Sequence, residues 1–320
     1  MNALRAQLEK LALILNELGG ERVPARGKNI NIFLIDGDPL KRIKCTLANW
    51  TGVAYKVPRT ELEKCKERHE FQQSGVYFLF SSSEEEANKE VVYIGQAGLR
   101  NTGEGIYSRL KQHKSDENKS YWNEAVVLTT QNNSFGATEI SYLENRFTNL
   151  AKVADRFVVK NGNEPNLGNV TEEKESELEE FIDYAKIVLG TLGYKVLEPL
   201  SKLYQVDGIS ATTGQERNLY LKSSNAGPNR SYDATARQTD EGFVVLKGSK
   251  FALEVLVKQE KLKIEAKRKS LNLTDGIFQE DVLFKSPNEA ATIIYGGAIN
   301  ATISWKDSTG KTLKDIEKES

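Results

Sequence analysis

The chain has 320 residues, enough for two domains or for one domain with large additions. Apolar residues make up 39% and charged residues 28%, a composition typical of a globular protein with a buried core. The 44 Lys and Arg residues nearly balance the 45 Asp and Glu residues, for a net charge of −1. Overall charge therefore excludes a generally basic nucleic-acid-binding protein, and any basic surface must be local.

The N-terminal segment predicts an amphipathic helix over residues 3–18, with a seam of leucines at Leu4, Leu8, Leu11, Leu15 and Leu18. The seam could pack against the protein's own body or join two copies in a homodimer. Its apolar run LALIL is too short, and its flanks too charged, for a signal peptide or a membrane span, so no membrane partner is expected. Two cysteines, Cys45 and Cys65, do not make a disulfide framework and favour a reduced, cytoplasmic location.

Residues 1–70 are interpreted as this helix followed by a small β-rich extension. The runs NINIFLID and IKCTLANW are separated by Asp36-Gly37-Asp38-Pro39, a strong turn signal, and GVAYKVP follows them. These runs predict a small β-sheet that precedes the main domain. The segment ELEKCKERHEF then predicts a short helix or connector.

The pattern changes between residues 75 and 154. GVYFLF (75–80) and VVYIGQ (91–96) are short, rich in β-branched and aromatic residues, and joined by a polar loop. The spacing predicts a helix over 105–113, a strand over 125–130 and a helix over 137–154. The order β-β-α-β-α indicates a compact α/β sandwich, assigned to a domain of residues 71–170.

The polar stretch from Asn161 to Pro165 breaks the chain. Residues 172–192 then predict a helix that is acidic at its start, where the helix dipole favours negative charge, and we interpret residues 171–198 as a connector between domains. The rest, residues 199–320, is expected to be a C-terminal α+β accessory domain. It contains the strand FVVLKGS, a basic helix over 257–271 and a helix that begins at a Ser-Pro cap in SPNEAATIIYG.

The glycines of VVYIGQAGLR raise the question of a phosphate-binding loop. A Walker loop requires GxxxxGK[ST] and a dinucleotide site requires GxGxxG, and neither spacing occurs here. A nucleotide cofactor is therefore not expected.

The two strands instead carry a paired motif. Gly75-Val76-Tyr77 opens the first strand and Tyr93-Ile94-Gly95 closes the second. This pair resembles the GIY-YIG nuclease family, with Val76 in place of isoleucine. The family also has an arginine on the next helix and a glutamate on a later one, and Arg109 and Glu144 stand at these places.

Two further features extend the resemblance. His113 matches a histidine of the restriction-enzyme branch. The stretches IFLIDGDP, NWTGVAYKVPR, TDEGFVVLKGS, LFKSPNEAATIIYGGAIN and SWKDSTGKTL resemble a bacterial subgroup in which a C-terminal domain of unknown function follows the nuclease. The implied fold class is α+β, a GIY-YIG-type module with an N-terminal extension and a C-terminal accessory domain.

The resemblance implies phosphodiester hydrolysis by water attack. Arg109 would offer a permanently charged fork matched to phosphate oxygens. His113, four residues later on the same helix face, could accept a proton directly or through a tyrosine. Glu144 lies at the edge of an apolar helix stripe, where a carboxylate needs a partner, and a single, mostly hydrated Mg²⁺ (or Mn²⁺) would supply it.

Tyr77 and Tyr93 would have separate roles in the reaction. Tyr77 is expected to act as base or to position the water, and Tyr93 to contact or orient the phosphate. A phenol needs nearby positive charge to act as a base at neutral pH. Gly75 and Gly95 are expected to permit backbone conformations rather than to take part in chemistry.

Two points stay open in the sequence. Many family members have an asparagine after the glutamate helix, and Asn145, Asn149 and Asn161 are all candidates for it. Nucleic acid could be held by Lys111, Lys114 and Lys119 near Arg109, and by six basic residues between positions 258 and 269.

The sequence thus favours a metal-dependent endonuclease that acts on DNA rather than RNA, in restriction or defence. The alternatives are a catalytically idle nucleic-acid-binding or interaction protein on the same scaffold, and an RNA-cleaving enzyme.

Overall fold

The structure is a computed structural model that describes residues 27–81, 90–98, 105–162, 168–200, 204–206, 209–211, 217–223, 227, 229–256 and 261–319. The predicted leucine seam lies outside these residues, as does the segment 99–104 before the Arg109 helix. Within the described residues, no helix has the length and apolar character needed to cross a membrane. Cys45 and Cys65 are both buried and free.

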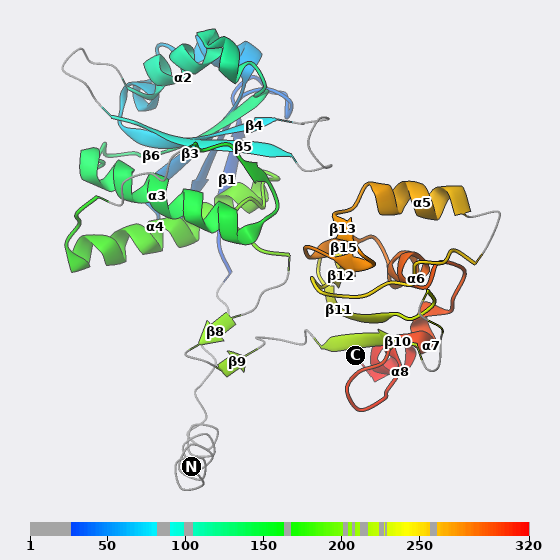
Figure 1. The fold of residues 1–320 in the computed structure, drawn as a ribbon. Helices are drawn as coiled ribbons and strands as arrows, with labels where there is room; N and C mark the ends of the chain where they lie inside the picture. Colours follow the sequence, from blue (N-terminus) through cyan, green and yellow to red (C-terminus); the bar gives the residue numbers. More distant parts are fainter. Residues whose placement is uncertain are drawn as a thin grey trace, which may run out of the picture.

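A seven-stranded sheet forms the first structural unit, in the order β1-β2-β3-β6-β4-β5-β7 (Figure 1). All neighbouring strands are antiparallel except β5 and β7, which are parallel. The strands are β1 (Ile30–Leu34), β2 (Ile43–Leu47), β3 (Gly52–Pro58), β4 (Gly75–Ser81), β5 (Val91–Ala97), β6 (Glu124–Thr130) and β7 (Val158–Val159).

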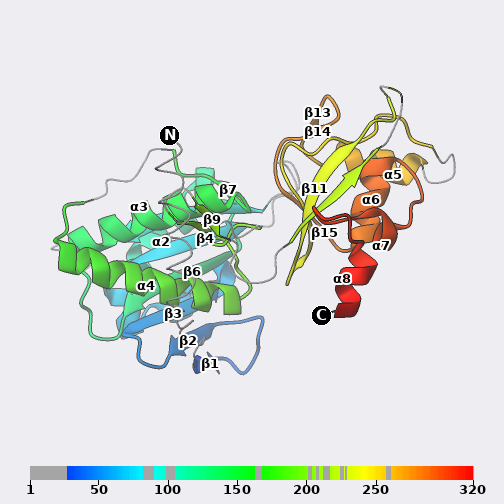
Figure 2. The same ribbon diagram turned by 90° about the horizontal axis from the view of Figure 1, so that it is seen from below.

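Helices cover both faces of this sheet. The helix α2 (Ile106–Ser115) lies on one face, and α3 (Ala137–Ala154) and α4 (Glu172–Thr191) lie on the other (Figures 1 and 2). Three short 3-10 helices, η1 (Arg59–Cys65), η2 (His69–Gln72) and η3 (Glu117–Lys119), complete the α2 side. Two apolar cores result, one on each face.

The predicted α+β class is confirmed. From Gly75 to Ala154 the observed order is β4-β5-α2-β6-α3, which agrees with the order expected from periodicity. In β4 every residue is buried, with Tyr77 and Leu79 in the core under α2 and Val76, Phe78 and Phe80 in the core under α3. Burial on both faces explains why this strand is a continuous apolar run.

The N-terminal strands do not form a small sheet of their own, as the sequence had suggested. Instead, β3 pairs with β6 along its whole length, from Gly52 opposite Thr130 to Pro58 opposite Glu124. The segment 61–71, expected as a helix or connector, contains most of η1 and η2, and these 3-10 helices pack against α2. The β-rich extension therefore continues the same sheet and supports the α2 face.

The helix α4 also belongs to the first unit, although the sequence suggested a connector between domains. Its apolar side packs on the sheet in the same core as α3. Thr171 is its N-cap and accepts a hydrogen bond from the Lys174 amide (3.4 Å). The predicted acidic first turn is present, with Glu172, Glu173 and Glu175 near the positive end of the helix dipole.

A second sheet, in the order β10-β11-β12-β15, forms the core of the C-terminal unit with α5, α6, α7 and α8. Its elements are β10 (Asn218–Lys222), β11 (Asp233–Thr239), β12 (Gly242–Val245), β15 (Val282–Phe284), α5 (Lys261–Lys269), α6 (Pro287–Tyr295), α7 (Ala301–Ser304) and α8 (Leu313–Glu319). Two short ribbons, β8 (Tyr204–Val206) with β9 (Ile209–Ala211) and β13 (Leu273–Thr274) with β14 (Ile277–Phe278), complete the element order.

The α6 cap is the one expected from the sequence. Ser286 accepts a hydrogen bond from the Glu289 amide (3.1 Å), and Pro287 occupies the first helical position. Arg156, just after α3, forms an ion pair with Glu241 in the turn between β11 and β12 (2.5 Å). This pair links the end of α3 to the C-terminal unit.

Candidate active site

A polar cavity opens at the end of β5, between α2 and α3. Its volume is about 310 Å³. The lining residues come from the end of β5, the first turns of α2 and the start of α3, and they are Gln96, Ala97, Gly98, Gly105, Ser108, Arg109, Gln112, Ala137, Ile140 and Ser141. Beyond Val91 and Val92, no described strand pairs with β5 on the side of β7, and the cavity lies at this end of β5.

Tyr77 and His113 form a buried pair beside this cavity. The Tyr77 hydroxyl lies 2.6 Å from His113 Nε2, and the side chains are 0% and 3% exposed. Burial, together with the positive charges of Lys119 and Arg109, lowers the pKa of His113 to about 4, so the ring is neutral at pH 7. In the tautomer with its proton on Nδ1, His113 accepts a hydrogen bond from the Tyr77 hydroxyl.

Burial also raises the pKa of Tyr77, and the nearby Tyr93 adds to this effect. Arg109 acts in the opposite direction, because its positive charge favours the phenolate. A phenol in this environment does not ionise alone at neutral pH. The Tyr77 hydroxyl can give up its proton only while it receives a proton from another group. His113 is in place to accept the proton that leaves Tyr77.

Gly95 leaves the space that the Tyr77 ring occupies. Tyr77 and Gly95 are directly opposite in the β4–β5 ladder. A Cβ at position 95 would lie 2.4 Å from the Tyr77 hydroxyl oxygen and 2.6 Å from its Cζ. Gly95 is not among the glycines with positive φ. Its role is therefore to give room to Tyr77, and the expectation that it serves backbone freedom is wrong.

Tyr93 is the accessible phenol of the two. It is only partly buried, and its ring centroid lies 6.4 Å from that of Tyr77 and 5.4 Å from that of His113, the latter in an edge-to-face arrangement. Burial raises the pKa of Tyr93 and the negative charge of Glu144 adds to this, whereas Arg109 favours the ionised form. Lys119 Nζ lies 4.0 Å from the centre of the Tyr93 ring.

Arg109 projects from α2 and lines the cavity, where its Nη1 donates to Gln112 Oε1 (3.1 Å). The pKa of Arg109 is raised: burial lowers it, but the phenols Tyr77 and Tyr93 and the carboxylate of Glu144 together outweigh burial. The guanidinium is thus permanently charged and electrostatically coupled to groups from β4, β5 and α3.

Glu144 reaches the same region from α3. Its Oε2 accepts a hydrogen bond from Gln96 Nε2 (2.8 Å), and Gln96 is the residue that follows Gly95 on β5. Burial raises the pKa of Glu144, while the bond from Gln96 and the charge of Arg109 oppose the shift. The Glu144 carboxylate is therefore partly desolvated, and an added cation would favour its ionised form.

The side-chain oxygens of Glu144, Ser141 and Gln96 suit a hard divalent cation. Glu144 is a carboxylate, Ser141 supplies a hydroxyl that donates to the Gln96 side-chain oxygen (3.3 Å), and Gln96 supplies an amide. Mg²⁺ and Mn²⁺ prefer oxygen ligands, and Mg²⁺ usually keeps several waters and takes one or two carboxylates. No cluster of three or more His, Cys, Asp or Glu side chains occurs in the part of the chain that the structure describes, so a closed protein cage is not the fitting arrangement.

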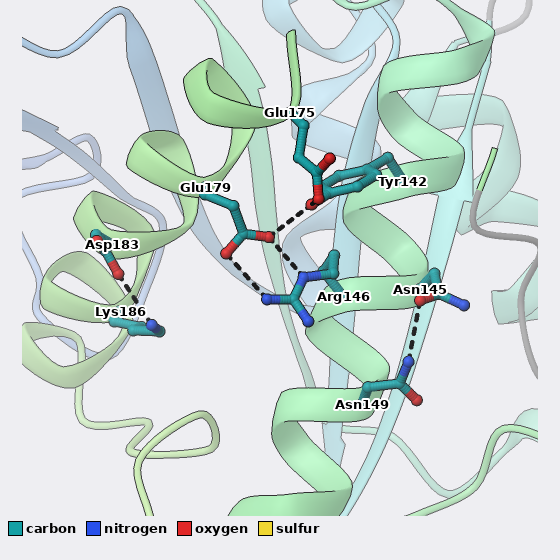
Figure 3. Close-up of polar contacts among 8 residues, drawn as sticks. All are labelled: Tyr142, Asn145, Arg146, Asn149, Glu175, Glu179, Asp183 and Lys186. Carbon is teal, nitrogen blue, oxygen red and sulfur yellow. Dashed lines mark hydrogen bonds and ion pairs between the residues drawn. The ribbon is translucent and has the colours of Figure 1, made fainter. Parts of the chain in front are cut away.

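Of the three candidate asparagines, Asn161 is the one beside the site. Its Oδ1 accepts from the Ile94 amide (3.1 Å) and its Nδ2 donates to the Ile94 carbonyl (2.7 Å). The side chain thereby continues the pairing that β7 begins and fixes the β5 backbone between Tyr93 and Gly95. By contrast, Asn149 Nδ2 donates to Asn145 Oδ1 (3.0 Å) along α3 (Figure 3).

The helix that carries Glu144 is held by α4. The Tyr142 hydroxyl donates to Glu179 (2.7 Å) and to Glu175 (3.2 Å), and Arg146 forms a two-point contact with Glu179 (2.5 and 3.0 Å) (Figure 3). These side chains all lie between the two helices. They fix α3 against α4 and so set the position of Glu144, which lies two residues after Tyr142 and two residues before Arg146.

All five predicted site residues therefore lie around one edge of the sheet. Sequence reasoning missed Gln96, which holds Glu144, although its place directly after the YIG motif was visible. It also left Asn161 among three candidates, because a side chain that pairs with a strand backbone leaves no spacing signal.

Comparison with known proteins bears on the C-terminal unit. Residues 226–317 match a domain of unknown function, DUF4357. The match lies inside the predicted accessory domain and covers the sheet strands β11, β12 and β15 with α5 to α8. No curated protein and no solved structure matches the chain.

Proposed function

We propose that the protein is a metal-dependent endonuclease of the GIY-YIG type, with DNA as the favoured substrate. The observation that supports the proposal is the convergence of five side chains from four elements, β4, β5, α2 and α3, at one edge of the sheet. Tyr77 and His113 lie in hydrogen-bond contact, and Tyr93, Arg109 and Glu144 are coupled to them. A purely structural cluster would not need a neutral histidine, a permanent cation and a desolvated carboxylate so near one another.

The proton acceptor in this proposal is the pair of Tyr77 and His113. As water attacks phosphorus, the water oxygen forms the new P–O bond and its proton passes to Tyr77, which passes its own proton to His113 Nε2. The P–O bond to the leaving oxygen breaks, and that oxygen takes a proton from solvent. Since His113 is neutral at pH 7, it is in the correct state to accept.

Tyr93 is assigned to the substrate because it is the more accessible phenol. The attacking water and the phosphate would enter beside it and meet the cavity at Arg109. The guanidinium stabilises the charge that develops on the phosphoryl oxygens, which is the main requirement of this reaction class.

Glu144, with Gln96 and Ser141 nearby, would hold one divalent metal ion. When bound, the ion would neutralise charge on the phosphate. The hydrogen bond from Gln96 occupies one carboxylate oxygen and orients the other.

Incubation with supercoiled plasmid DNA and with a structured RNA, each with Mg²⁺ or with EDTA, tests the proposal. Plasmid nicking that requires Mg²⁺ and is lost in Glu144→Ala is expected. Nicking that persists in Glu144→Ala would refute the site. Binding without cleavage of either substrate would favour an idle scaffold, and cleavage of RNA alone would favour an RNA-cleaving enzyme.

A further inference from the structure

Lys111, Lys114 and Lys119 follow Arg109 in the chain, and each has a different environment in the structure. Lys111 is exposed on α2. Lys114 forms an ion pair with Glu63 of η1 (3.7 Å). Lys119 is the last residue of η3, and its ammonium lies 4.0 Å from the centre of the Tyr93 ring. Among the three, Lys119 alone contacts a residue of the candidate site.

Lys119 carries its charge beside the Tyr93 ring and near Arg109. No carboxylate lies within ion-pair distance of the Lys119 ammonium in the described part of the chain; its contact there is the face of the Tyr93 ring. Asp116 favours its charge from within the same turn, while partial burial and the positive charge of Arg109 lower its pKa. Two cations held near one another in a partly buried site raise the energy of the fold unless an anion joins them.

The turn that carries Lys119 is fixed by Arg59. From the start of η1, Arg59 Nη1 donates to the carbonyl oxygens of Lys119 (3.1 Å), Ser120 (3.3 Å) and Trp122 (3.4 Å), and Nη2 donates to that of Lys114 (2.9 Å). The guanidinium also stacks over the Trp122 ring at 4.8 Å. The backbone of Lys119 is thus anchored before any ligand arrives, which lowers the entropic cost of using its side chain.

Lys119 and Arg109 reach the site from different elements. Arg109 comes from the second turn of α2 and lines the cavity, whereas Lys119 follows the end of that helix and covers Tyr93. Both disfavour a proton on His113 through their charge, so both lie near the catalytic pair. The phenol of Tyr93 therefore has cationic groups close to it from two sources.

We propose that Lys119 and Arg109 form a two-cation seat for the nucleic-acid backbone at Tyr93. The inference rests on the proposed function for the identity of the ligand, a phosphodiester. Lys119 binds a phosphate oxygen as a point charge, and Arg109 supplies the planar fork at the reacting phosphate. Arg59 is a positioning residue, since it acts through the backbone of the η3 turn.

The matched variants are Lys119→Gln and Lys111→Gln, which remove one positive charge each from the α2 region. Binding of a 20-base-pair duplex is measured in EDTA over a range of salt concentrations, so that cleavage plays no part. Lys119→Gln is expected to weaken binding about tenfold and to reduce the slope of log K against log salt by about one, and Lys119→Arg to restore most of both. Lys111 was also a candidate nucleic-acid contact from the sequence, but it is exposed on α2, away from the Tyr93 ring, so Lys111→Gln is expected to change both values much less than Lys119→Gln. Equal effects of the two Gln variants would overturn the proposal.

Inorganic pyrophosphate, followed by titration calorimetry in EDTA, separates the seat from the proposed function. We expect wild-type protein and Lys111→Gln to bind it, and Lys119→Gln to bind at least fivefold more weakly. If pyrophosphate behaves in this way but no nucleic acid is bound or cut, the seat stands and the nuclease proposal falls. If wild-type protein and Lys119→Gln bind pyrophosphate equally, or neither binds it, the seat is refuted even where plasmid is cleaved.

Discussion

Gly95→Ala is the substitution that tests most sharply how the site is built. The added methyl carbon would lie 2.4 Å from the Tyr77 hydroxyl oxygen, 2.6 Å from Cζ and 2.9 Å from Cε2. These distances are far below van der Waals contact, and Tyr77 is fully buried, so the ring must move. Its movement would break the 2.6 Å contact with His113.

The expected cost follows from the chemistry of an overpacked core. One extra methyl group in a well-packed site costs about 1–3 kcal/mol. For a unit of this size, each kcal/mol lowers the melting temperature by roughly 2–4 °C. Because proton transfer by a positioned group contributes about 10²–10⁴-fold to rate, the loss of the Tyr77–His113 contact should reduce plasmid nicking by at least about 10²-fold.

The assay compares Gly95→Ala with Gly98→Ala, three residues further along the chain. Among the described residues, a Cβ added at position 98 would meet Ile140 Cδ1 at 3.3 Å, the end of a flexible side chain. We expect Gly98→Ala to keep near wild-type stability and, although Gly98 lines the cavity, to lose much less activity than Gly95→Ala, as measured by thermal unfolding and single-turnover nicking. Equal stability and activity of Gly95→Ala and wild type would refute the packing argument for Tyr77.

Three further substitutions test the site from other directions. Arg109→Lys keeps the charge but loses the planar fork, so the rate of nicking should fall about 10–10³-fold. The melting temperature should stay unchanged, since Arg109 bonds to Gln112 in an exposed contact three residues along the same helix. A wild-type rate would show that Arg109 takes no part in the chemistry. His113→Gln tests how stability depends on pH. In the wild type the pKa of His113 is about 4 in the folded state and 6.5 in the unfolded state, so between these pH values the unfolded chain binds a proton and the folded chain does not. The free energy of unfolding of the wild type should therefore fall by about 3 kcal/mol as the pH drops from 6.5 to 4. Urea unfolding at several pH values should show a shallower fall in the variant, and parallel curves would mean that His113 is not held neutral. Tyr142→Phe removes the hydroxyl that bonds to Glu179 and Glu175. The free energy of unfolding, measured in urea, should fall by about 1 kcal/mol. An unchanged midpoint of the urea unfolding curve would show that this contact does not hold α3 on α4.

Local patterns predicted the elements of the first unit well. The strand at β4 and the helix at α3 follow from apolar runs and helical spacing, and their observed limits differ from the predicted ones by a residue at most. Such elements depend on contacts between near neighbours in the chain. The same holds for the cap of α6, which the neighbouring residues Ser286 and Pro287 specify.

Pairing over long distances could not be read in this way. The β3–β6 ladder joins residues more than sixty positions apart, and the apolar side of α4 indicated burial without indicating against which surface. At the site, the contact of Lys119 with Tyr93 and the amide pairing of Asn161 with Ile94 depend on how the η3 turn and the end of β7 approach β5. A single sequence carries no periodic signal for such contacts.

The central claim is that Glu144, Arg109 and the Tyr77–His113 pair cut phosphodiester bonds as one site. It is tested most directly by the rate of Mg²⁺-dependent plasmid nicking by wild-type protein, Tyr77→Phe, Glu144→Gln and the control Glu180→Gln, whose residue is exposed on α4. We expect nicking by wild type and Glu180→Gln, and losses of at least about 10²-fold in both site variants. Wild-type rates in Tyr77→Phe and Glu144→Gln, or no cleavage by any of the four proteins, would contradict it.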